Sequence, residues 1–219
     1  MIMGGLFKNI GEKCRKIFHP SSGKVMTEEE IAKKKMQTDY DYLIKRGVET
    51  ELGYVTLYGN PIIVKKEGSV IRMGKGVVLV SNSSANTAGV NHPVIIATYS
   101  EKAEVVIGDN VGMSGTSINC VDSCIIQEGV KLGANVNVWD TDFHPLDPVA
   151  RANQKSILEA PSAPIVLEKN VWVGANSTIL KGVTIGENTV VGTMSLVKKS
   201  LPANSICAGI PASKIKDLN

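Results

Sequence analysis

Aromatic and charged residues are both scarce in this chain. Phe, Trp and Tyr make up 5% of the 219 residues and the charged residues 21%, whereas hydrophobic residues reach 43%. A core built around large rings is therefore not expected, and the 21 glycines indicate many tight turns between small aliphatic side chains. The apolar content excludes a disordered chain and favours one folded domain with a small appendage.

The chain also lacks a strong charge bias. Its formal charge is +3 and its basic residues are scattered, so we expect no nucleic-acid partner. The four cysteines, Cys14, Cys120, Cys124 and Cys207, form no CxxC pair and show no zinc-ligand spacing. They are predicted to be buried free thiols in a reducing compartment, and no metal site is expected.

The first 18 residues lack an apolar run long enough for a signal peptide or a membrane span. We expect a cytoplasmic protein without membrane contact; an amphipathic helix on a membrane surface is the alternative for this stretch. Thr27 and Glu30 then form the pattern of a capping box, and apolar residues follow at helical spacing, which predicts a helix over residues 28–46. Residues 1–50 are thus expected to be an N-terminal helical segment.

A repeat of six residues follows. Its clearest apolar positions are Leu167, Val173, Ile179, Ile185, Val191 and Val197. Small or β-branched residues stand four places after these positions, at Val171, Ser177, Val183, Thr189 and Ser195. Both sets are predicted to point inward. The residue after the apolar one is often glycine (Gly174, Gly186, Gly192), as expected where a corner needs either no side chain or a positive φ.

Six residues cannot enclose a core alone, so three units are expected to form one triangular coil of about 18 residues, with stacked coils burying an aliphatic column. The same spacing recurs upstream, with a shift of one residue, and includes Cys120 and Cys124 as inward core residues. We therefore predict an all-β parallel β-helix over residues 51–209, followed by a tail over residues 210–219. Between Val138 and Ile165 the repeat stops, which predicts an excursion loop over residues 139–164, a place where function concentrates.

Three segments are similar to the hexapeptide-repeat acyltransferases, specifically the maltose, galactoside and polysaccharide O-acetyltransferases. They are HPLDPVAR, which begins at His144, NVWVGANSTILKGVTIGENTVVGTMSLVKKS, and AGIPASKIK, which ends at Lys216. The resemblance covers about Val55 to Lys216. It implies a left-handed coil, an exception to the right-handed crossover rule. It also implies a homotrimer that uses acetyl-CoA as co-substrate, with no permanently bound cofactor, to acetylate a hydroxyl of a sugar or polysaccharide precursor.

Acetyl transfer to a hydroxyl requires a base to accept the proton as the oxygen attacks the thioester, and imidazole suits this task. In the HPLDP context, His144 is the predicted base of a direct transfer within a ternary complex. A neighbouring carboxylate is expected to orient its ring, and we favour Asp142 for this role.

The resemblance also implies where acetyl-CoA binds. Trp172 is expected beside the thioester, because a residue just before an inward valine points outward. Backbone amides near Ala175 and Thr193 are expected to meet the pantetheine, and three lysines to meet the phosphates. These lysines are Lys198, Lys199 and Lys216.

For the acceptor, Trp139 and Asp140 are candidate sugar-binding residues next to the loop. Asn91 and His92 form a second candidate element, which a neighbouring subunit is expected to bring beside His144. Two alternatives from other classes remain. A zinc-dependent γ-type carbonic anhydrase needs three converging histidines, and this chain has only His19, His92 and His144. A non-catalytic β-helix that serves as a binding module is the other.

Overall fold

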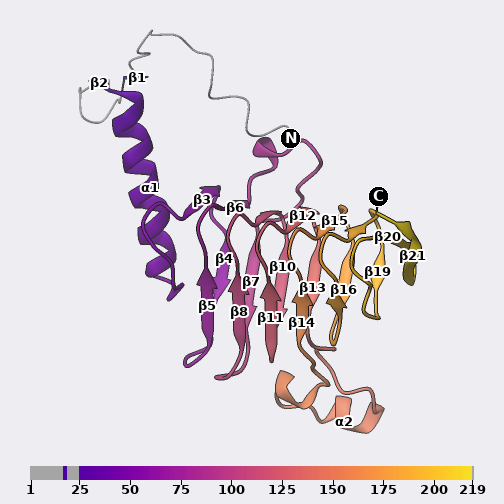
Figure 1. Ribbon diagram of the computed structural model, residues 1–219. Helices are drawn as coiled ribbons and strands as arrows, with labels where there is room; N and C mark the ends of the chain where they lie inside the picture. The colour runs from indigo at the N-terminus through magenta and orange to yellow at the C-terminus, as the bar shows by residue number, and fades with distance from the viewer. Residues whose placement is uncertain (1–16, 19–24, 219) are drawn as a thin grey trace.

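The computed structural model describes residues 17–18 and 25–218, and most of them form a parallel β-helix with three flat faces (Figure 1). The first face contains β3 (Val55–Tyr58), β6 (Val77–Val80), β9 (Gly112–Ser114), β12 (Lys131–Ala134), β15 (Trp172–Val173), β18 (Val190–Val191), β20 (Ser205–Gly209) and β21 (Ala212–Asp217). The second contains β4 (Ile62–Val64), β7 (Ile95–Thr98), β10 (Ser117–Cys120), β13 (Asn137–Trp139), β16 (Thr178–Leu180) and β19 (Leu196–Val197). The third contains β5 (Val70–Met73), β8 (Glu104–Ile107), β11 (Ser123–Ile126), β14 (Ile165–Leu167) and β17 (Thr184–Ile185).

The chain visits the three faces in turn, so three corners run along the body. We call the corner between the first and second faces the first corner, that between the second and third faces the second corner, and the remaining one the third corner. An excursion with the short helix η1 (Ser83–Ala85) leaves the first corner after β6. A longer one leaves the second corner after β13 and contains α2 (Pro148–Ala152) and η2 (Ile157–Glu159). Figure 1 shows that α2 projects away from the stacked strands.

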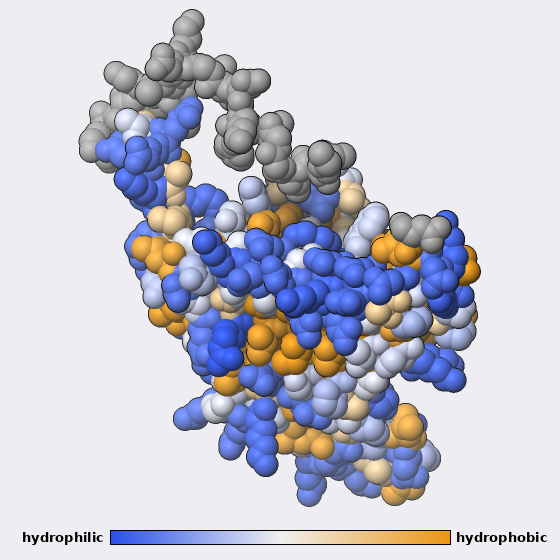
Figure 2. Space-filling model, viewed as in Figure 1, coloured by the Kyte–Doolittle hydropathy of each residue, from blue (hydrophilic) through white to orange (hydrophobic). Residues whose placement is uncertain are grey.

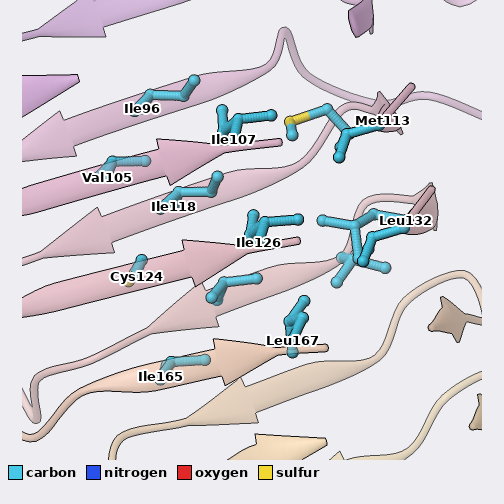
Figure 3. Packing of buried hydrophobic residues seen from close by; sticks show 14 of the residues in the cluster. Ile96, Val105, Ile107, Met113, Ile118, Cys124, Ile126, Leu132, Ile165 and Leu167 are labelled. Carbon is cyan, nitrogen blue, oxygen red and sulfur yellow. The ribbon is translucent and has the colours of Figure 1, made fainter. Parts of the chain in front are cut away.

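The predicted inward register is confirmed. All six apolar positions of the clearest repeat, from Leu167 to Val197, are at most 1% exposed. The small residues four places later are buried as well, and so are Cys120 and Cys124. Figure 3 shows side chains from successive coils, among them Ile107, Ile126 and Leu167, stacked in one column.

Glycine at the corners serves the close stacking of coils. A Cβ at Gly174 would lie 2.5 Å from the backbone nitrogen of Thr193 in the next coil, and one at Gly192 would lie 2.8 Å from the Cβ of Ala208. The positive φ angles fall instead two residues later, at Asn176 (58°) and Met194 (56°). Of the two reasons expected for these glycines, the lack of a side chain is therefore the one that applies.

The N-terminal helix α1 (Glu28–Ile44) begins with the predicted capping box: Glu30 N–H donates to Thr27 Oγ1, and Thr27 N–H donates to Glu30. It ends two residues before the predicted end. Two short strands, β1 (Ile17–Phe18) and β2 (Val25–Met26), pair antiparallel before it. Most of the stretch for which a membrane-surface helix was the alternative lies outside the described residues.

The C-terminal residues depart from the expected tail. Residues 212–217 form β21, which pairs antiparallel with β20 and extends the first face by one strand.

Among the residues that the structure describes, no helix has the length and apolar character needed to cross a membrane.

Candidate active site

His144 lies on the excursion at the second corner and is exposed to solvent. Phe143 before it adopts a positive φ of 61°, and its ring packs edge-on against Trp139 at the end of β13, with 5.7 Å between ring centroids. Pro145 after it is buried. The loop is thus packed against the β-helix on both sides of His144. This packing directs the imidazole away from the β-helix.

A hydrogen-bond network fixes the tautomer of this imidazole. The side-chain nitrogen of Gln154 donates to the carbonyls of Phe143 and Ser156, at 2.9 Å each. Its oxygen Oε1 must therefore accept, and it lies 2.7 Å from His144 Nδ1. The proton of the neutral ring is placed on Nδ1, which leaves Nε2 as a free proton acceptor. These groups border a cavity of about 390 Å³.

The predicted orienting contact between Asp142 and His144 is not formed. Asp142 Oδ1 binds Lys181 Nζ at 2.5 Å, and its backbone N–H donates to the carbonyl of Pro161. Gln154 takes the orienting position instead. This role of Gln154 could not be predicted from the sequence, because the residue lies ten positions from His144 in a segment with no periodicity that could bring the two together.

Asp140 cannot contact a sugar in this structure, because it is completely buried. Its two carboxylate oxygens each accept a backbone N–H at 2.7 Å, from Val121 and Asp122 of the preceding coil. Loss of hydration raises its pKa, while these two hydrogen bonds act to lower it. The prediction of a substrate contact at Asp140 is therefore wrong: the residue holds the second corner together where the excursion leaves.

Two thiols share this corner with Asp140. The sulfur atoms of Cys120 and Cys124 and a carboxylate oxygen of Asp140 lie within 4.8 Å of one another. A hydrogen bond with Cys120 and burial raise the pKa of Cys124 well above its ordinary value, so this thiol keeps its proton. The polar atoms of this cluster already form hydrogen bonds within the chain, so we assign the cluster a structural role.

We expect Asp140→Ala to lower the free energy of unfolding by about 2 to 4 kcal/mol, because it leaves two backbone donors without their acceptor. Asp142→Ala is the matched control. It removes a partly exposed ion pair and is expected to cost less than about 1 kcal/mol. Urea denaturation measures both, and a similar small loss in the two variants would contradict the structural role of Asp140.

The acceptor candidates Asn91 and His92 lie at the first corner, on the excursion after β6. Asn91 is exposed and its backbone N–H donates to Asn135 Oδ1 at 3.1 Å, while His92 Nδ1 lies 2.8 Å from the carbonyl of Pro93. His144 leaves the second corner, across the width of the second face. One chain therefore does not bring His92 and His144 together.

The donor candidates cluster at the first face and the first corner. Trp172 points outward, is 56% exposed and lies beside Val190 in the strand register, as predicted. Ala175 and Thr193 occupy equivalent turns of successive coils at the first corner. Their backbone N–H groups make no hydrogen bond within the described part of the chain, although Thr193 Oγ1 donates to the Ala175 carbonyl at 2.6 Å.

The three predicted lysines do not form one group. Lys216 lies on β21 and pairs in register with Ile206 on the first face. Lys198 and Lys199 are exposed at the second corner, directly after β19. Only Lys216 therefore shares a face with Trp172 in a single chain.

Parallel strands stacked in coils of six-residue units define a class of protein, the hexapeptide-repeat transferases. The family model of the bacterial transferase hexapeptide (six repeats) matches residues 164–199. The galactoside O-acetyltransferase of Escherichia coli strain K12 is 32% identical over 170 residues, which cover 77% of this chain and 76% of the relative. The chain belongs to the hexapeptide-repeat acetyltransferase family, and it is an enzyme of that kind.

Two further similarities agree with this assignment. The putative lipopolysaccharide biosynthesis O-acetyl transferase WbbJ of the same organism is 32% identical over 120 residues, which cover 52% of this chain and 61% of the relative. Among solved structures, a mutant of AntD, an N-acyltransferase from Bacillus cereus in complex with dTDP and coenzyme A, matches with a TM-score of 0.57. The match has 22% identity and covers 75% of this chain and 81% of the other, so it bears on the fold alone. The predicted left-handed parallel β-helix is confirmed.

Proposed function

We propose that this protein transfers the acetyl group of acetyl-CoA to a hydroxyl of a sugar or polysaccharide precursor, with His144 as the general base. The observation that carries the proposal is the free Nε2 of His144, whose tautomer Gln154 fixes. Neutral imidazole with one free nitrogen accepts the hydroxyl proton while the oxygen attacks the thioester carbonyl. The proton then passes to the departing thiolate, and the acetyl group moves in one step within the ternary complex.

The donor site that we propose follows the first corner. The N–H groups of Ala175 and Thr193, which have no partner among the described residues, are one coil apart and are proposed to donate to the two amide carbonyls of the pantetheine arm. Trp172 on the adjoining first face supplies an exposed ring beside this path. Of the three predicted lysines, Lys216 lies on this same face and is proposed to meet the phosphates, and Lys198 and Lys199 are proposed to reach them from a second copy.

The active site is then completed between copies of the chain, where the second corner of one meets the first corner of the next. In this proposed arrangement His144 lies beside Asn91 and His92 of the neighbouring copy, which is the juxtaposition expected in the sequence analysis. Repeating it around a three-fold axis turns the second face toward the axis, because this face lies between the two corners.

The second face has the composition that such a position needs. None of the outward residues on its strands carries a charge. They are Ile62, Val64, Ile95, Ala97, Ser117, Asn119, Asn137, Trp139, Thr178, Leu180 and Leu196. The excursion of His144 also exposes Leu146, Val149 and Leu158, and Figure 2 shows apolar surface at the end of the molecule where α2 lies. Contact with a second copy would cover these side chains.

We therefore expect a homotrimer, and sedimentation equilibrium should give three times the chain mass of 23.4 kDa. Leu180→Asp on the outward side of the second face should dissociate the trimer and remove activity together. Thr184→Asp on the third face is the control and should leave the trimer intact. A stable monomer that still turns over acetyl-CoA would exclude this assembly.

We expect Gln154→Ala to lower kcat by about 10-fold to 100-fold with little change in KM, because His144 loses the acceptor that fixes its ring and tautomer. Gln154→Glu keeps an acceptor for Nδ1 and should recover part of the rate. Asn153→Ala, at the adjacent residue, is the control. Steady-state kinetics test this expectation, and a full rate in Gln154→Ala would show that the network does not position the base.

The donor and acceptor chemistry is tested by a screen of hydroxyl compounds with acetyl-CoA, in which the released thiol is measured. Release that depends on a sugar hydroxyl supports the proposal, and no acceptor-dependent release would contradict it. The carbonic anhydrase alternative needs three histidines, and of His19, His92 and His144 the first lies outside the described residues. A non-catalytic module would not need the fixed tautomer of His144.

A further inference from the structure

A second cavity lies at the first corner, between helix α1 and the start of the excursion after β6. Its volume is about 400 Å³, within the range of small-molecule sites. The lining includes Lys35 of α1, Tyr58 at the end of β3, Asn60 of the turn that follows, and Asn82 and Ser84 of the excursion. None of the residues proposed above for catalysis or donor binding lines this cavity.

The polar groups of the cavity are held in place and keep unused donors. Lys35 Nζ donates to Asp39 Oδ2 and to the Leu57 carbonyl, at 2.6 Å each, which leaves one of its three N–H groups. Asn82 Oδ1 accepts from the backbone and the hydroxyl of Ser84, at 2.9 Å each. The NH₂ group of Asn82 has no hydrogen-bond partner among the described residues, and the residue is exposed.

The charge and the exposed ring together indicate the chemistry of the ligand. Asp39 compensates the charge of Lys35, so the cavity offers no free cation for a phosphate or carboxylate. Tyr58 is 46% exposed beside these donors. An exposed aromatic ring surrounded by amide and hydroxyl groups suits a neutral pyranose. The apolar face of the sugar packs on the tyrosine ring while the sugar hydroxyls form hydrogen bonds.

The cavity lies on the same corner as the proposed donor site, but at the other end. It is formed by the first and second coils, whereas Ala175 and Thr193 belong to the fifth and sixth. The excursion connects the two regions, because Asn82 lines the cavity and Asn91 binds Asn135 in the fourth coil. Three coil spacings separate the first coil from the fourth, about 14 Å. A single sugar at the reacting position cannot span this distance, whereas a chain of several sugars can.

We propose that this cavity binds a distal sugar unit of an extended, neutral carbohydrate acceptor, several units from the hydroxyl that is acetylated. The inference rests on the proposed function, which places the reacting unit near Asn91 and Ala175. It specifies the acceptor class as an oligosaccharide or polysaccharide in preference to a free monosaccharide.

The test uses the full chain and an array of neutral hexose oligosaccharides, from monosaccharides to hexasaccharides. Wild-type protein should bind the longer members at least about tenfold more tightly than the monosaccharides of the same sugar. Tyr58→Ala should abolish this preference, Tyr58→Phe should keep most of it, and Tyr40→Ala, on α1 outside the cavity, should not change it. Thermal unfolding of each variant shows that the fold is kept.

Thiol release with acetyl-CoA, measured on the same preparations, separates this inference from the proposed function. Acetyl transfer that does not depend on the length of the oligosaccharide, or that favours long oligosaccharides equally in Tyr58→Ala and wild type, overturns the distal site. The proposed acetyltransferase function would then still hold. Binding that depends on oligosaccharide length and on Tyr58, without any acetyl transfer, would support the distal site and contradict the proposed function. Binding to no member of the array overturns the distal site.

Discussion

Replacement of His144 by alanine is expected to lower kcat by two to four orders of magnitude, roughly the contribution of a positioned general base. The donor is held by the groove at the first corner, so the dissociation constant of acetyl-CoA should change little. The fold should also survive, because His144 is an exposed loop residue and not part of the column.

Lys155→Ala provides the matched control, because Lys155 lines the same cavity without contacting the His144 ring through a hydrogen bond. It should keep most of the rate. If His144→Ala retained more than about a tenth of wild-type activity on the true acceptor, His144 could not be the principal base. His92 would then be the next candidate. A variant that lost both acetyl-CoA binding and rate would indicate a collapsed excursion.

The second large effect is expected in the core. Ile185→Asp should prevent folding, because it removes a fully buried aliphatic side chain and places an unpaired carboxylate in the column. The expected cost of roughly 4 to 8 kcal/mol is comparable to the whole stability of many domains. Circular dichroism and the yield of soluble protein measure the outcome.

Thr184→Asp, one residue earlier, is the control for Ile185→Asp. Thr184 is partly exposed and points outward from the same strand, so an aspartate there keeps its hydration. It should cost less than about 1 kcal/mol. If the two variants melted alike, the inward register derived for the whole column would be wrong.

The fold could be predicted because the repeat carries its own physical constraint. Each six-residue unit needs an inward aliphatic residue and a corner that tolerates the next coil, and residues such as Ile179 and Gly174 repeat that requirement along the chain. The position of His144 on an excursion followed from the interruption of this pattern. The antiparallel pairing of β21 did not follow from the repeat, because this strand is mostly exposed and lacks the inward residues that mark the repeat.

The details of the site were less predictable, because they depend on contacts inside an aperiodic loop. Asp140 and Asp142 are two residues apart in one acidic stretch, yet one caps a buried corner and the other binds Lys181 from the next coil. Only the three-dimensional path of the excursion distinguishes them. Gln154 reaches His144 for the same reason, as a long-range contact that spacing along the chain does not reveal.

The chemical product of the reaction shows most directly whether this protein is a sugar O-acetyltransferase that uses His144 as its base. Purified wild-type protein, acetyl-CoA carrying a ¹³C-labelled acetyl group and a series of neutral oligosaccharides would be incubated and the sugars analysed by mass spectrometry and NMR. We expect one labelled acetyl ester on a sugar hydroxyl, formed by the wild type and formed far more slowly by His144→Ala. Label that appears only as free acetate at the same rate in both proteins would contradict it.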